Sequence, residues 1–171
     1  MKLSPVFAIF AFAPINADAA PTAKSKKADA AKVVQMVTIT GACTKLVHIG
    51  QPVDGCKKTL VNMNYSTGVS AYWFMAERTI LSFSGDGTHR IEQGPGTIVQ
   101  AINRIVLGAT DGTDDEARER AAVGFCRFSD PAKEGALLEC MAHTEAGLSE
   151  GIFRADGRPP GLDEFPVSVN E

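Results

Sequence analysis

The stretch TLVNMNYSTGVSAYWFMAERTILSFSGDG, residues 59–87, alternates apolar and polar side chains over much of its length. Near its start, Val61, Met63 and Tyr65 fall on one face of an extended chain, and the two asparagines between them fall on the other. Successive side chains of a β-strand point to opposite sides of the sheet. Alternation with a period of two therefore predicts half-buried strands that keep one face in water.

The same alternation continues on both sides of this point. Leu81 and Phe83 share a face opposite two serines, and the stretch VTIT, residues 37–40, alternates in the same way. Glycine-containing turn signals separate the candidate strands at residues 66–68, 85–87, 94–96 and 146–147. Short strands with closely spaced turns predict a mainly β protein, an antiparallel β-sandwich or β-barrel with at most one or two short helices.

Three stretches fit this pattern less well. TIVQAINRIVLG, residues 97–108, obeys a helical period, but its isoleucine and valine content favours a strand. TDDEARERAA, residues 113–122, starts as a capping box and continues with good helix formers, which predicts one short helix or an acidic loop. The consecutive aromatic residues Tyr72, Trp73 and Phe74 predict a strand that is covered on both faces.

The four cysteines form two local couples, Cys43 with Cys56 and Cys126 with Cys140. Neither couple has the close C-x2-C spacing of a zinc site or a thioredoxin-like redox pair. Four cysteines permit three connectivities, and sequence alone does not exclude the crossed ones. We predict local pairing, because each couple brackets a turn-like stretch that suits a hairpin. These two stretches are residues 51–55 and 130–135.

The N-terminus has the organisation of a secretory signal. Lys2 is followed by an apolar segment, residues 6–13, and then by the small-residue cleavage pattern of residues 17–19. We therefore predict a signal peptide at residues 1–19, a mature chain starting at Ala20, and export to the periplasm or the medium. The apolar segment is far shorter than the roughly 20 residues of a membrane-spanning helix. No transmembrane segment is predicted in the mature chain.

Composition divides the mature chain into three parts. Residues 20–32 carry four lysines, one aspartate and no large apolar side chain, which predicts a flexible basic arm. Residues 33–156 form the predicted β-rich domain, and residues 157–171 a loose tail rich in proline and glycine. From residue 33 onward there are 12 basic and 18 acidic side chains, a net charge of −6. Nucleic acid is therefore not an expected partner, because its phosphates require a basic face.

The motifs predict no catalytic residue, no cofactor and no metal site. The three histidines, His48, His89 and His143, are not spaced to share one metal ion, and we expect each in an exposed loop. DGTDDE, residues 111–116, offers oxygen ligands but lacks the spacing of a calcium-binding loop. SFSGDG, residues 82–87, lacks the preceding glycine of a nucleophile elbow.

Three short motifs carry a family resemblance: CTKLV at residues 43–47, ILSFSGDG at residues 80–87 and GFCRFSDP at residues 124–131. Together with the leader and the two cysteine couples, they resemble a group of small exported proteins of Gram-negative bacteria with no assigned activity. The resemblance covers roughly residues 33–160. It implies an extracytoplasmic β-domain and no site residues.

Two function classes follow from these observations. The first is a non-enzymatic binding, inhibitory or envelope-structural protein, whose partner is an envelope protein or another extracytoplasmic molecule. The alternative is a small extracytoplasmic hydrolase with a site built from scattered carboxylates, His89 and His143. A hydrolase predicts a deep pocket where such groups converge. A binding protein predicts a flat or grooved patch, near Tyr72, Trp73 and Phe74 if any of these is exposed.

Overall fold

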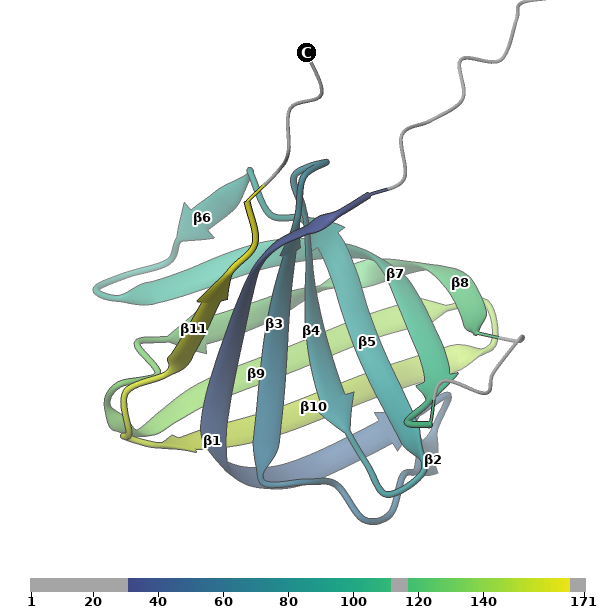
Figure 1. Ribbon diagram of the computed structural model, residues 1–171. Coiled ribbons are helices and arrows are strands. Elements are labelled where there is room, and N and C mark those ends of the chain that lie inside the picture. Colours follow the sequence, from purple (N-terminus) through teal and green to yellow (C-terminus); the bar gives the residue numbers. More distant parts are fainter. Residues whose placement is uncertain (1–30, 112–116, 167–171) are drawn as a thin grey trace, which may run out of the picture.

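Strands that follow one another in the chain pair side by side in one antiparallel sheet (Figure 1). The computed structural model describes residues 31–111 and 117–166, and in these residues all the regular structure is β-strand. The strands are β1 (Val33–His48), β2 (Gln51–Pro52), β3 (Thr59–Tyr65), β4 (Val69–Met75), β5 (Thr79–Asp86), β6 (Arg90–Glu92), β7 (Thr97–Ala109), β8 (Arg118–Ser129), β9 (Glu134–Thr144), β10 (Gly147–Asp156) and β11 (Gly161–Glu164).

Eight of these strands close into a barrel, because β1 pairs with both ends of the series. The order is β10-β9-β8-β7-β5-β4-β3-β1, and β1 pairs again with β10. The first half of β1, residues 33–40, pairs with β3, and residues 41–47 pair with β10. Figure 1 shows β1 at the front beside β3 and then passing below toward the strands at the back. Of the two predicted architectures, the chain adopts the barrel, in which these eight strands have no long free edge.

One face of each strand fills the barrel with side chains. Phe74, Phe83 and Phe153 are almost completely buried, and the rings of Phe74 and Phe83 meet edge to face at 5.7 Å. Leu81 is buried beside them, as the alternation of β5 predicts. An eight-stranded barrel has an interior just wide enough for side chains or for one small ligand.

The sequence pattern of β3 suggested that its apolar face lies in the core and its asparagine face in water, and the structure shows the reverse. Val61, Met63 and Tyr65 lie on the outer wall, and the asparagines point inward. The physical reason is that the amides find partners inside the barrel. The Asn62 Nδ2 group donates to Ser70 Oγ at 2.9 Å and to a backbone carbonyl of β4 at 3.1 Å. A buried amide that is hydrogen-bonded avoids most of its desolvation cost.

The ambiguous stretch at residues 97–108 is a strand, as predicted, and lies within β7. The short helix or acidic loop predicted over residues 113–122 is wrong for residues 118–122, because β8 begins at Arg118. Residues 118–121 pair with residues 104–107 of β7, and this long-range pairing overrides the local helix propensity. Residues 113–116 of this stretch lie outside the described residues.

Both predicted disulfides are confirmed. Cys126 and Cys140 lie directly opposite each other on β8 and β9, with their Cα atoms 4.0 Å apart. Cys43 and Cys56 are also bonded, with a Cα–Cα distance of 5.9 Å. Paired cysteines are typical of an oxidising, extracytoplasmic compartment.

The turn predicted within the first disulfide loop is at a different place. The chain reverses at Ile49 and Gly50, which both have positive φ (51° and 74°), and not at residues 51–55. Cys56 therefore lies in the connection between β2 and β3 and not in the second strand of a hairpin. The bridge ties β1 to this connection.

The C-terminal segment is paired where a loose tail was predicted. β11 lies against residues 35–38 of β1, and the N–H of Phe165 donates to the carbonyl of Val34 at 2.8 Å. Residues 1–30 and 167–171, which include the predicted signal peptide and most of the predicted basic arm, lie outside the described residues. In the part of the chain that the structure describes, no helix is long and apolar enough to cross a membrane.

Candidate functional site

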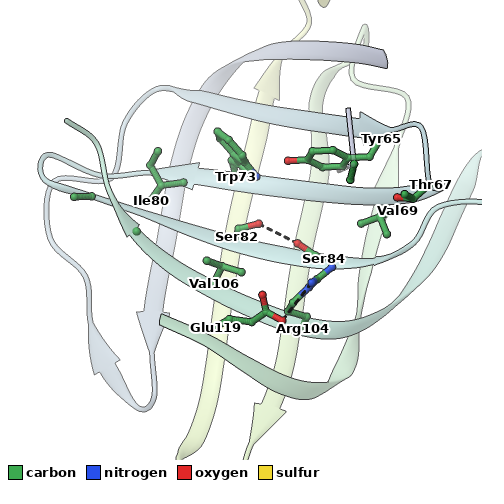
Figure 2. Close-up of a pocket in the computed structure, with 13 residues that line it drawn as sticks. Tyr65, Thr67, Val69, Trp73, Ile80, Ser82, Ser84, Arg104, Val106 and Glu119 are labelled. Carbon is green, nitrogen blue, oxygen red and sulfur yellow. Dashed lines mark hydrogen bonds and ion pairs between the residues drawn. The ribbon is translucent and has the colours of Figure 1, made fainter. Parts of the chain in front are cut away.

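A groove lies on the outer wall of the barrel and extends over β3, β4, β5, β7 and β8 (Figure 2). Its floor is β5, whose outward side chains here are the small residues Ser82 and Ser84. Both serines are buried, and their hydroxyl oxygens lie 3.2 Å apart in a hydrogen bond. The alternation that directs Leu81 and Phe83 into the barrel places two small serine side chains on the outer face of the same strand. The surface is therefore hollowed at this point.

Longer side chains stand on both sides of this floor. Tyr65 and Trp73 project from β3 and β4, and Arg104 and Val106 project from β7 (Figure 2). The register places Trp73, Ser82 and Val106 in one row across three strands. The groove has a volume of about 470 Å³. It is large enough to receive several side chains of a partner.

The groove carries one positive and one negative charge at its edge. Arg104 Nη1 lies 3.2 Å from Glu119 Oε1, and both side chains are partly exposed. An exposed pair of this kind contributes little to stability, so its charges are available to a partner. Burial raises the pKa of Tyr65, and the positive charge of Arg104 opposes this shift. The Tyr65 hydroxyl is therefore protonated at neutral pH and able to donate a hydrogen bond.

Comparisons with protein-family models, with curated proteins and with solved structures found no match. The chemistry of the groove is therefore the basis for a functional assignment. Tryptophan, tyrosine and arginine are the residue types that most often dominate the binding energy of protein interfaces. Trp73, Tyr65 and Arg104 bring all three types into this one groove.

Of the three consecutive aromatic residues singled out in the sequence, only Trp73 faces the groove. Tyr72 and Phe74 point into the barrel and are buried. Tyr65 and Arg104 were missed by sequence reasoning. Alternation groups Tyr65 with the apolar residues of β3 and does not mark it as a surface residue. Arg104 lies in a stretch that was considered only for its apolar residues.

The structure places His89 and His143 on separate elements. His89 lies in the exposed segment between β5 and β6, with its Nδ1 2.6 Å from Asp86 Oδ2. Hydrogen bonds from Thr88 and from His89 hold the pKa of Asp86 well below its usual range. His143 lies on the exposed side of β9. His89 fits the prediction of an exposed loop histidine, whereas His143 is exposed but belongs to a strand and not to a loop. Among residues 31–111 and 117–166, no group of three His, Cys, Asp or Glu side chains is arranged to hold a metal ion.

His48 differs from the prediction of an exposed loop histidine, because it is half-buried at the end of β1. Its Nδ1 lies 3.2 Å from Ser149 Oγ, and the same oxygen accepts the N–H of Ile49 at 3.1 Å. Ser149 has no exposed surface. The hydrogen bonds of Ser149 hold the turn between β1 and β2 against β10.

His48 should make part of the stability of the barrel depend on pH. Burial lowers its pKa from the usual 6.5, and the positive charges of Arg120 and Arg118 lower it further. As the pH falls, His48 therefore becomes protonated in the unfolded chain before it does so in the folded chain. The contribution that neutral His48 makes to the free energy of unfolding is complete above pH 6.5 and is lost as the pH falls below this value. We expect His48→Asn to show a smaller loss of stability between about pH 7 and about pH 5. Urea midpoints over this range measure the difference, and identical pH profiles would contradict it.

Proposed function

We propose that this chain is an exported, non-enzymatic binding protein that acts in the periplasm or in the medium. Its partner is another extracytoplasmic protein, which it engages through the groove on the outer wall of the barrel. The observation that carries the proposal is the meeting of Trp73, Tyr65 and Arg104 over a floor of small side chains. The two disulfides and the resemblance to small exported proteins support the compartment. An inhibitory or a structural role in the envelope would use the same contact.

The groove defines the chemistry of the partner. An apolar side chain fits between Trp73 and the aliphatic residues Ile80 and Val106, which line the same groove. Polar groups next to it would contact the ion pair of Arg104 and Glu119. Because this pair offers both signs of charge, the partner surface is expected to carry both signs as well.

The chain contains a single tryptophan, Trp73, so its fluorescence reports directly on the groove. The tagged mature protein is used to capture partners from an envelope extract, and each captured protein is purified and titrated against the chain. We expect a shift of the Trp73 emission on binding. We expect Trp73→Ala to weaken binding about 30-fold, the effect of losing a hot spot of about 2 kcal/mol.

Phe165→Ala is the matched control, because it removes another aromatic side chain that is 45% exposed and does not line the groove. It should leave the affinity unchanged, and urea unfolding should show that both variants are folded. Equal affinities for the native protein and for Trp73→Ala would exclude the groove as the binding site. Cleavage of the captured protein by the native chain would instead favour the hydrolase alternative.

A further inference from the structure

A second, smaller cavity lies inside the barrel and is separate from the groove. It has a volume of about 120 Å³ and lies between the wall formed by β1, β3 and β4 and the wall formed by β8, β9 and β10. Most of its lining is apolar, with Val37, Ile39, Phe128, Leu138 and Phe153 among its residues. An apolar cavity of about 150 Å³ is known to hold one benzene molecule, so space of this size is suited to an apolar body of about five carbons.

Arg90, from the short strand β6, is the cationic residue in the lining of this cavity. Its guanidinium carbon lies 5.7 Å from the centre of the Phe128 ring, in a cation–π contact. Its Nε donates to Gln100 Oε1 at 3.1 Å, and its Nη2 donates to Ser70 Oγ at 3.1 Å and to Asn64 Oδ1 at 3.3 Å. All of these acceptors are neutral. Within the described residues, no carboxylate forms an ion pair with Arg90.

The groups that hold Arg90 are themselves held in place. Gln100 is completely buried, its Nε2 donates to the Ser70 carbonyl at 3.2 Å, and the Tyr72 hydroxyl donates to its Oε1 at 3.3 Å. This network uses Nε and Nη2 of Arg90, and no hydrogen bond joins Nη1 to another residue that the structure describes. A positioned guanidinium with unused donors beside an apolar cavity is suited to bind an oxyanion.

We propose that this cavity binds a small monocarboxylate with an apolar body. The carboxylate accepts hydrogen bonds from Arg90 at the rim, and the apolar body lies against Val37, Leu138 and Phe153. Burial of the apolar part supplies the non-specific share of the affinity, and the guanidinium selects for the negative charge. The site is independent of the partner groove, because Trp73 faces outward whereas its neighbour Tyr72 lines this cavity.

The test compares three ligands that each have a linear chain of six carbon atoms in total: hexanoate, hexan-1-ol and hexylammonium. Each is titrated into the native protein by calorimetry at low salt, where exposed charges are least screened. We expect hexanoate to bind about tenfold or more tightly than hexan-1-ol, since a hydrogen-bonded ion pair replaces a neutral contact. Hexylammonium should bind more weakly than either. Equal affinities of hexanoate and hexan-1-ol, or no binding of hexanoate at millimolar concentration, would overturn the proposal.

Two variants locate the site. Arg90→Gln should weaken hexanoate binding about tenfold or more and leave hexan-1-ol unchanged. Ala136→Phe, which places a ring in the cavity, should weaken both ligands. Unchanged hexanoate affinity in Arg90→Gln would place the anion elsewhere and contradict the proposal. If Arg90→Gln does not fold, the relative affinities of the three ligands for the native protein still decide whether the cavity selects a carboxylate.

The result is distinguishable from that of the partner groove. Trp73→Ala should bind hexanoate with the affinity of the native protein, because Trp73 does not line this cavity. Loss of hexanoate binding in this variant, with the barrel still folded, would mean that the carboxylate occupies the groove and would overturn the inner site. Failure to find a partner protein for the groove has no bearing on these titrations.

Discussion

Gly41→Ala should destabilise the barrel by about 3 kcal/mol or more, at the upper end of what overpacking costs. A Cβ atom at this position would lie 2.0 Å from the carbonyl oxygen of Arg154 and 2.9 Å from the Cα atom of Ala155. Both are backbone atoms of β10, so no side-chain rotation relieves the contact. The strands would have to separate at the point where β1 closes the barrel.

The position of Gly41 explains why the expected effect is so large. Its N–H donates to the carbonyl of Lys58 at 3.0 Å, just before β3, and its Cα pairs with Ala155 of β10. Gly41 therefore contacts both neighbours of β1, at the point where the partner of β1 changes from β3 to β10. Displacing it disturbs the pairing that makes the sheet a closed barrel.

Gly108→Ala is the matched control, since it makes the same change within β7. No heavy atom lies within 4 Å of a Cβ atom built there, and its φ is not in the left-handed region. Replacing a strand glycine with alanine should then raise stability by about 0.5 kcal/mol through the unfolded state. Urea unfolding followed by circular dichroism measures all three proteins. A Gly41→Ala midpoint close to that of the native protein would show that β1 and β10 do not approach as closely as described.

Removing the second disulfide should cost more stability than removing the first. The paired cysteines are separated by 13 and 14 positions in the sequence, so the loop-closure entropy is nearly equal, about 3 kcal/mol for each bridge. The difference lies in burial. Cys126 and Cys140 are completely buried, whereas Cys43 and Cys56 are only partly buried. Deleting buried sulfur atoms also removes core contacts and leaves a cavity.

We therefore expect the double alanine variant at Cys126 and Cys140 to lose about 4–5 kcal/mol of the free energy of unfolding. The double alanine variant at Cys43 and Cys56 should lose about 2–3 kcal/mol. For a domain of this size the larger loss corresponds to a fall in Tm of roughly 8–20 °C. Replacing both partners avoids a free thiol in either variant. The reverse order of the two Tm values would contradict the burial argument. Non-reducing peptide mapping checks the pairing, and a Cys43–Cys126 peptide would disprove it.

Several features of this fold depend on short-range information and are therefore readable from the sequence. Leu81 and Phe83 point inward because they alternate with Ser82 and Ser84, whose small polar side chains take the outer face of β5. The two disulfides join cysteines that are close in the chain, so local pairing was the simplest expectation. The isoleucine and valine content of residues 97–108 indicated a strand because branched side chains suit a pleated surface.

Other features depend on which segments meet, and only the tertiary structure decides them. Alternation in β3 defines two faces but not which of them is inside. Asn62 lies inside because Ser70 on the next strand satisfies its amide. Residues 118–121 form a strand and not a helix because β7 offers them a partner. In both cases the deciding contact lies outside the window from which a local pattern is read.

The candidate sites belong to this second class. Each residue type in the groove was visible in the sequence, but Trp73, Ser82 and Val106 form one row only through the register of β4, β5 and β7. A slip of one residue would turn every one of these side chains to the opposite face. The sequence by itself determined most of the strands, the two disulfides and the supply of apolar side chains for the interior. The closure of the barrel through β1, and with it the groove and the cavity beside Arg90, required long-range pairings that no local pattern specifies.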